Sequence, residues 1–212
     1  MRGKFITLEG GEGTGKTTHA GQLADALNRS GVDAVVTREP GGAPGAEEIR
    51  ALLVAGEVGR WQALTEALLH FAARNEHLTR TVLPALQAGR WVVCDRFADS
   101  TVAYQGYGHG LDREAIARLS ELVLGDFAPD LTLILDLPVE EGLRRASRRT
   151  AGHEDRYERM DLGFHQRLRE GFLEIARDQP QRCAVVAADT TAEEVQAAIR
   201  AVVGQRLGVA LE

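Results

Sequence analysis

The segment 10–17 constrains this chain more than any other feature. It reads Gly-Gly-Glu-Gly-Thr-Gly-Lys-Thr and matches the phosphate-binding pattern G-x-x-x-x-G-K-[ST]. A strand-like run precedes it at residues 4–9, and a stretch with helical spacing follows. In such a loop, backbone N–H groups bind the phosphates of a nucleoside triphosphate, Lys16 supplies charge to the outer phosphates, and the Thr17 hydroxyl can bind Mg²⁺. The alternative is a glycine-rich turn with a solvated lysine. Such a turn would have to match the whole pattern by chance, and to do so between a strand and a helix.

The size and charge of the chain predict one domain that does not bind nucleic acid. Its 212 residues carry a net charge of −6, whereas duplex binding depends on a basic surface. Cys94 and Cys183 lie in apolar runs typical of buried strands, which fits a reducing compartment. We find no signal peptide before the first strand and no run of ~20 apolar residues. We therefore expect a cytoplasmic protein that does not contact a membrane.

Short β-branched runs alternate with amphipathic segments along the chain, which predicts an α/β fold. We expect an open five-stranded parallel sheet with helices on both faces, with strands at residues 4–9, 33–38, 90–95, 131–136 and 183–187. Expected helices are 17–30, 46–55, 65–87 and 112–124. The charged stretch at about 144–159 is typical of a mobile lid within a single domain, 1–212. A solvated helix end is the alternative for that stretch.

Polar residues end the expected strands, at the edge of a parallel sheet where ligands bind. Asp95 is our first candidate for a magnesium ligand beside Thr17, and Glu9 is the second. The alternative for Asp95 is a helix cap or a salt bridge. Asp136 is expected to cap the next helix.

Three arginines are candidates for binding phosphate. Arg38 and Arg96 follow strands, and Arg74 lies in the long expected helix. A guanidinium binds phosphate through two hydrogen bonds, which favours an acceptor that is itself phosphorylated. For Arg74, a solvated position on the helix surface is the alternative.

Together these motifs resemble the bacterial thymidylate kinases, P-loop nucleoside-monophosphate kinases that phosphorylate dTMP with ATP. The resemblance spans essentially the whole chain. Its landmarks are the segments 8–18 and 37–42, Asp95-Arg96 with Ser100, Tyr104-Gln105-Gly106, and the segment 129–132.

The resemblance implies dTMP and ATP as substrates, Mg²⁺ as cofactor, and a homodimer. The apolar face of the segment 65–87 could form the subunit contact, but core packing is the alternative and the default interpretation. Residues implied to bind ATP are Gly10, Gly11, Glu12, Gly13, Thr14, Gly15, Lys16, Thr17 and Thr18. Residues implied to bind the acceptor are Glu9, Arg38, Glu39, Pro40, His70, Phe71, Arg74, Arg96, Ser100, Tyr104 and Gln105. Implied catalytic residues are Glu12, Lys16, Asp95, Arg96 and Arg149.

The resemblance also assigns individual roles. The three arginines would bind the dTMP phosphate or the phosphoryl group in transfer, and Glu39 would order the phosphate-site loop. Ser100 and Gln105 would contact the thymine, and Tyr104 would pack on the deoxyribose and exclude a 2′-hydroxyl. Glu12 in the loop, together with basic residues in the lid, resembles the subtype whose catalytic arginine comes from the lid and not from the loop. Arg149 is the expected lid arginine, with Arg145, Arg148 and Arg156 as alternatives.

One position departs from the family pattern. The family usually has a phenylalanine four residues before the helix arginine, where its ring stacks on thymine, and this chain has His70 there. Phe71 is three residues before Arg74, and both spacings place a side chain on the arginine's side of a helix. Either ring could stack on the base, and a helix histidine making one polar contact is a further interpretation.

The expected reaction is a direct in-line transfer of the ATP γ-phosphoryl group to dTMP, with no covalent intermediate. A lid that closes over both substrates would exclude water, so we expect little ATP hydrolysis without an acceptor. A P-loop kinase acting on another small molecule is one alternative. A nucleotide-dependent switch is another, although the chain contains no Asn-Lys-x-Asp segment of the kind that reads guanine.

Overall fold

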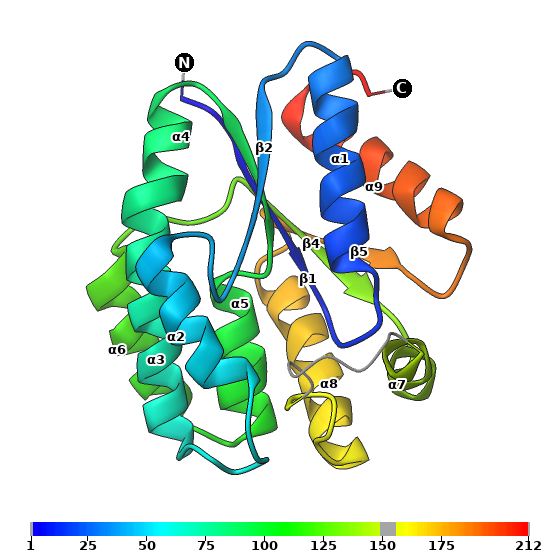
Figure 1. Ribbon diagram of the computed structural model, residues 1–212. Helices are drawn as coiled ribbons and strands as arrows, with labels where there is room; N and C mark the ends of the chain where they lie inside the picture. Colours follow the sequence, from blue (N-terminus) through cyan, green and yellow to red (C-terminus); the bar gives the residue numbers. More distant parts are fainter. Residues whose placement is uncertain (1, 149–155, 212) are drawn as a thin grey trace.

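The computed structural model describes residues 2–148 and 156–211 as a parallel sheet covered by helices (Figure 1). The strands in these residues are β1 (Phe5–Glu9), β2 (Ala34–Arg38), β3 (Trp91–Asp95), β4 (Leu131–Asp136) and β5 (Cys183–Ala187). They form one sheet in the order β2-β3-β1-β4-β5, and every neighbouring pair is parallel. The predicted fold class is confirmed, and each expected strand agrees with the observed one to within a residue.

Three of the expected helices are present as α1 (Lys16–Arg29), α2 (Pro44–Val54) and α6 (Arg113–Leu124). The expected helix 65–87 is instead divided into α3 (Ala63–His77), the π-helical segment η1 (Leu78–Val82) and α4 (Leu83–Gln87). Further helical segments are α5 (Ala98–Thr101), the π-helical η2 (Val102–Gly108), α7 (Val139–Ser147), α8 (Leu162–Asp178) and α9 (Ala192–Leu207). No helix in the described parts of the chain is long and apolar enough to span a membrane.

Side-chain caps fix where the later helices begin. Asp161 accepts a hydrogen bond of 2.7 Å from the Phe164 N–H at the start of α8, and Thr191 forms a capping box with Glu194 at the start of α9. By contrast, α1 begins after Gly15, which has a φ of 83° and provides no side-chain cap. The first N–H groups of α1 are therefore available to an anionic ligand.

The central strands β1, β3 and β4 are buried on both faces, which is why they are mostly apolar. Ile6 and Leu8 of β1 pack against α1 and α9 in one core, whereas Phe5 packs against η1 and α4 on the opposite face. A third cluster joins Ile134 of β4 to α8 and η2. Figure 1 shows α1 and α9 together on one side of the sheet. Cys94 is buried and unpaired, as is Cys183, as expected.

Gly10 and Gly11 provide a test of how tightly the loop after β1 is packed. Gly10 has a φ of +132°, and a Cβ atom there would lie 2.4 Å from the Leu135 carbonyl oxygen. At Gly11 a Cβ atom would meet nothing within 4 Å. Gly10→Ala is expected to lower the free energy of unfolding by about 2 kcal/mol or more, and Gly11→Ala by less than about 1 kcal/mol. Urea unfolding followed by circular dichroism measures both, and equal losses would contradict this packing.

Candidate active site

The phosphate-binding loop connects β1 to α1 at the carboxyl edge of the sheet, where open α/β sheets bind ligands. Gly13 packs so closely on α7 that a Cβ atom there would lie 2.0 Å from the Gly142 carbonyl oxygen. The Lys16 ammonium lies folded into the loop and donates to the Gly11 carbonyl oxygen at 2.6 Å and to Thr14 Oγ1 at 3.1 Å. Burial lowers the pKa of Lys16 to about 8. An arriving phosphate would stabilise the charged form.

The two residues predicted to bind magnesium lie together. The Thr17 hydroxyl donates a hydrogen bond of 2.5 Å to Asp95 Oδ2. A hydroxyl and a carboxylate are oxygen ligands of the kind that Mg²⁺ takes, so this pair fits the ion. No group of three His, Cys, Asp or Glu side chains that could hold a metal occurs in the described residues. The other ligands of a Mg²⁺ ion here would therefore be phosphate oxygens and water.

Glu9, the second candidate for a magnesium ligand, is hydrogen-bonded to the segment that follows β3. Its side chain is fully buried, Oε1 accepts the Phe97 N–H at 2.7 Å, and Oε2 accepts the Ser100 hydroxyl at 2.6 Å. Burial and the nearby negative charge of Asp99 raise the pKa of Glu9 to about 8. Through these two hydrogen bonds Glu9 holds the segment after β3 in place.

Arg96 follows β3 directly and has a left-handed backbone conformation, with a φ of 72°. A residue other than glycine in this conformation costs roughly 1–3 kcal/mol, so the surrounding contacts must stabilise it. The Arg96 N–H donates to the Leu8 carbonyl oxygen at 3.0 Å. The guanidinium donates to the Gly10 carbonyl oxygen at 2.9 Å and to Glu12 Oε1 at 3.0 Å. It also lies 4.9 Å from the ring centroid of Tyr104. These contacts fix Arg96 against the phosphate-binding loop.

Glu12 is the negative group at the centre of the site. It accepts hydrogen bonds from Arg96 and from the Tyr104 hydroxyl. Burial raises the pKa of Glu12, but the positive charges of Arg96 and Lys16 outweigh burial and lower the pKa to about 2. Glu12 is therefore ionised at neutral pH, and its partners among the described residues are Arg96 and Tyr104.

The structure separates the arginines that were candidates for the lid. Arg145 donates to Glu141 at 2.7 Å and to the Ala188 carbonyl oxygen at 3.0 Å. Arg156 is fully buried in an ion pair with Glu66. Neither therefore faces the phosphate-binding loop. Arg148 is exposed at the end of α7, and Arg149 lies outside the described residues.

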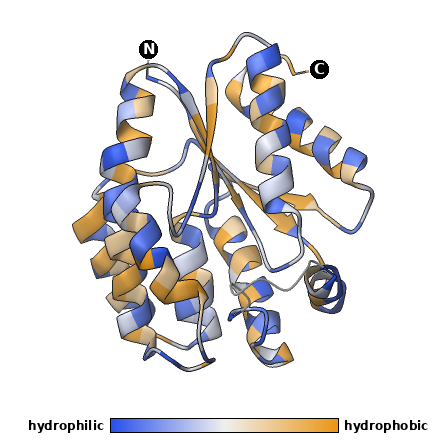
Figure 2. Cartoon of the chain, in the orientation of Figure 1, coloured by the Kyte–Doolittle hydropathy of each residue, from blue (hydrophilic) through white to orange (hydrophobic). Residues whose placement is uncertain are grey.

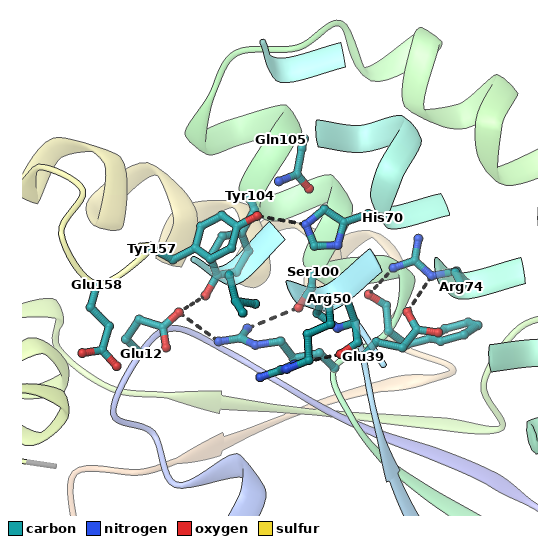
Figure 3. A pocket seen from close by; sticks show the side chains of 14 residues that line it. Glu12, Glu39, Arg50, His70, Arg74, Ser100, Tyr104, Gln105, Tyr157 and Glu158 are labelled. Atoms are coloured by element: carbon teal, nitrogen blue, oxygen red, sulfur yellow. Dashed lines mark hydrogen bonds and ion pairs between the residues drawn. The ribbon is translucent and has the colours of Figure 1, made fainter. Parts of the chain in front are cut away.

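A pocket opens beside Arg96 (Figure 3). The residues predicted to bind the acceptor that line it are Glu39, Pro40, His70, Arg74, Arg96, Ser100, Tyr104 and Gln105. Arg50, Tyr157 and Glu158 also line it and were not predicted. Arg50 lies in the expected helix 46–55, and Tyr157 and Glu158 lie in the expected lid, so only charge or aromatic character could have indicated them individually.

A second cleft lies over the phosphate-binding loop. It is lined by Lys16, Thr17 and Asp95, together with Arg38, whose guanidinium lies 3.1 Å from the Glu47 carboxylate. Residues that line both cavities are Glu12, Glu39, Arg50, Arg96 and Glu158. The loop cleft and the pocket therefore meet at Arg96 and Glu12.

Arg74 is 2% exposed, so the solvated helix position considered for it is wrong. Nε donates to Glu39 Oε2 at 2.8 Å, and Nη2 donates to the Phe97 carbonyl oxygen at 3.1 Å and to Thr101 Oγ1 at 3.0 Å. Glu39 also pairs with His77 Nδ1 at 2.9 Å. Arg74 Nη1 is buried without a hydrogen-bond partner among the described residues. One donor of this fixed guanidinium is therefore available to a ligand.

His70 lines the pocket and Phe71 does not. His70 Nε2 is hydrogen-bonded to the Tyr157 hydroxyl at 3.0 Å, as drawn in Figure 3. Phe71 is 2% exposed, and its ring centroid lies 4.9 Å from the Arg74 guanidinium. Phe71 therefore supports the arginine, and of the two candidate rings it is His70 that is available to a base in the pocket.

Comparisons with known proteins give one consistent result. A family model described as thymidylate kinase matches residues 8–199. The chain is 55% identical over 208 residues to a thymidylate kinase of Caulobacter vibrioides, which covers 98% of this chain and 99% of that protein. It is 48% identical over 211 residues to one of Bradyrhizobium sp., covering 99% of this chain and 93% of that protein. A crystal structure of thymidylate kinase from Ehrlichia chaffeensis superposes with a TM-score of 0.79 at 36% identity, covering 96% of this chain and 100% of that chain.

The partly buried position of His70 predicts a pH-dependent stability. Burial lowers the pKa of His70 from 6.5 to about 4, so the folded chain keeps this ring neutral. The unfolded chain binds more protons between these values, and stability falls as the pH falls from about 6.5 toward 4. In His70→Gln, the loss of unfolding free energy between pH 7.5 and pH 5.5 should be about 1 kcal/mol smaller than in the unmodified chain. Urea unfolding at both pH values tests this, and an unchanged loss would contradict it.

Proposed function

This chain belongs to the thymidylate kinase family, and we propose how its residues carry out the reaction. It is an ATP-dependent kinase that transfers the γ-phosphoryl group of ATP to dTMP, giving dTDP and ADP. The observation that supports this residue assignment is the junction of two cavities at Arg96 and Glu12. A triphosphate over the loop and a monophosphate in the pocket would meet there, as in-line transfer requires.

On the donor side, the phosphates of ATP would bind the N–H groups of the loop and the start of α1. Lys16 would leave its loop contacts to neutralise the outer phosphates. Thr17 and Asp95 would hold Mg²⁺, which supplies positive charge to the bridging phosphate oxygens. Asp95 is thus proposed as a ligand whose position is set by the end of β3.

On the acceptor side, Arg96 is the residue we assign to the dTMP phosphate. Its guanidinium can form two parallel hydrogen bonds to phosphate oxygens, and its backbone is already fixed. Arg38 and Arg50 line the neighbouring cleft and add positive charge. Orientation and charge neutralisation supply the rate, and no covalent intermediate is needed.

The base is assigned to the far part of the pocket, where two buried polar atoms have no partner among the described residues. Arg74 Nη1 is a donor, and Gln105 Oε1 is an acceptor. A 4-oxopyrimidine such as thymine presents the complementary pair, an oxygen at C4 and a hydrogen on N3. Cytosine presents the reverse pair, so a donor would face the Arg74 donor and an acceptor would face the Gln105 oxygen. His70 would stack on the ring, and Tyr104 would pack on the deoxyribose and exclude a 2′-hydroxyl.

The single domain 1–212, with a lid at about 144–159, stays a prediction, and residues 149–155 of that segment lie outside those described. Arg149 remains the proposed lid arginine. The cytoplasm is the proposed location, in agreement with two buried free thiols.

We assign the homodimer contact to the face of α3 and α6. Leu64 and Leu68 of α3 are each 48% exposed, and Leu122 of α6 is 82% exposed. Figure 2 shows apolar residues gathered on these packed helices. A face of this kind is typical of a subunit contact. Leu68→Arg should convert a dimer to a monomer in sedimentation velocity, whereas Val185→Arg on β5 should not; a monomeric unmodified chain would contradict the assignment.

A coupled assay of ADP formation tests the function directly. With ATP and Mg²⁺, dTMP should turn over fastest among dTMP, dUMP, dCMP, dGMP, dAMP and UMP, and ADP formation without an acceptor should be near zero. Another preferred acceptor would indicate a different P-loop kinase. No turnover above the control would favour a nucleotide-dependent switch.

The same assay tests Arg96. Arg96→Ala should lower kcat/KM for dTMP by roughly 10²-fold or more, because a fixed charge on the transferring group is lost. Arg90→Ala is the matched control, since Arg90 forms an exposed ion pair with Asp33 at 3.1 Å. Similar effects of the two substitutions would contradict the assignment of Arg96.

A further inference from the structure

A buried polar cluster lies behind the base end of the pocket. Glu66 of α3 is 1% exposed, and its two carboxylate oxygens have different partners. Oε1 accepts a hydrogen bond of 2.8 Å from Gln105 Nε2, and Oε2 accepts one from Arg156. Glu66 does not line the pocket, whereas Gln105 does. The cluster therefore connects Gln105, which lines the pocket, to the Glu66 carboxylate, which a ligand in the pocket would not contact.

The Arg156 guanidinium fixes the position of Glu66. Arg156 is fully buried and also donates to the Leu53 carbonyl oxygen at 2.9 Å and to the Glu57 carbonyl oxygen at 3.3 Å. His109 Nε2 lies 3.4 Å from Glu66 Oε1. Burial raises the pKa of Glu66, but His109 and Arg156 outweigh burial and lower it to about 2. Glu66 is thus ionised and can only accept hydrogen bonds.

An acceptor-only neighbour determines which way the Gln105 amide faces. The two ends of an amide have similar shapes but opposite hydrogen-bonding roles, so partners decide the orientation. The Glu66 carboxylate can pair with the NH₂ end and not with the oxygen. Gln105 Oε1 is left buried without a partner among the described residues. Gln105 lines the pocket together with His70, and Figure 3 shows its amide directed toward this pocket.

We propose that Glu66, held by Arg156, is a positioning residue that determines base specificity: it turns the Gln105 oxygen toward the base, and so selects a pyrimidine with a hydrogen on N3. The proposal rests on the proposed function and adds a residue outside the pocket to it. A base with an unprotonated N3, such as cytosine, would set two acceptors against each other. Thymine and uracil both carry the N3 hydrogen, so Glu66 separates them from cytosine and not from one another.

The substitution Glu66→Gln should reverse the orientation of Gln105. Arg156 is a donor only, so the new side chain would turn its oxygen to Arg156 and its NH₂ group to Gln105. Gln105 would then present its oxygen to residue 66 and its NH₂ group to the base. A donor in that position favours an unprotonated N3. The protein's preference should therefore move toward cytosine, which the loss of packing alone would not produce.

The test compares kcat/KM for dTMP, dUMP and 5-methyl-dCMP, because the last differs from dTMP only in the groups at N3 and C4. In Glu66→Gln, the preference for dTMP over 5-methyl-dCMP should fall by roughly tenfold or more, as expected for an inverted hydrogen bond. The preference for dTMP over dUMP should stay within about twofold, since both bases carry the same N3 hydrogen.

Two further variants complete the test. Glu76→Gln is the matched control, because Glu76 lies on the same helix in an exposed pair with Arg80 and should change neither preference. If Glu66→Gln does not fold, as judged by circular dichroism, the double variant Glu66→Gln with Arg156→Met replaces it. Removing both charges of a buried pair is often tolerated. That variant no longer dictates either orientation of Gln105, so its preference for dTMP over 5-methyl-dCMP should be lower than that of the unmodified chain, and an unchanged preference would overturn the proposal.

The outcomes separate the possibilities. An unchanged preference for dTMP over 5-methyl-dCMP would overturn the proposal. The proposal would also be overturned if the preference for dTMP over dUMP fell as much as the preference for dTMP over 5-methyl-dCMP. Equal losses would indicate a generally loosened pocket. If the unmodified chain does not phosphorylate dTMP at all, the proposed function fails, and this result is visible before any variant is compared.

Discussion

The site depends on one constrained residue, Arg96. Its left-handed backbone places the guanidinium between the phosphate-binding loop and the acceptor pocket, where it contacts the Gly10 carbonyl oxygen and Glu12. The N–H bond to Leu8 ties the same residue to β1. An unstrained conformation would point the side chain elsewhere, so the strain is part of how the two cavities are joined. Charge for phosphoryl transfer is thus positioned before any substrate binds.

Buried polar pairs hold this arrangement from behind. Glu9 fixes the segment after Arg96 through the Phe97 N–H and the Ser100 hydroxyl. Further back, Arg182 forms two hydrogen bonds of 2.7 Å to Asp99 in the same segment. The charges of Asp99 and Arg182 neutralise each other, because an unpaired buried charge would cost several kcal/mol. The polar side chains around the pocket are therefore fixed in orientation, and the orphaned atoms among them are the ones available to a substrate.

Sequence periodicity was enough to predict the sheet, because buried parallel strands form apolar runs that end at turn residues. The loop spacing likewise predicted the donor side. Pairings distant in the chain could not be predicted: Arg156 resembled a lid arginine, yet it pairs with Glu66, 90 residues away. Asp136 was expected to cap a helix, but it pairs with Arg169 at 2.7 Å, and Pro138 precedes α7. His70 and Phe71 fitted the same helix face, and tertiary packing decided between them.

The central claim is that Arg96 lies between donor and acceptor phosphates. A crystal structure with thymidine and adenosine joined through a polyphosphate bridge tests it most directly. The account predicts the Arg96 guanidinium within hydrogen-bond distance of the phosphates on the thymidine side, with its N–H still bonded to Leu8 and its φ still positive. A phosphate bridge bound by other arginines, with Arg96 still paired to Glu12 alone, would contradict it.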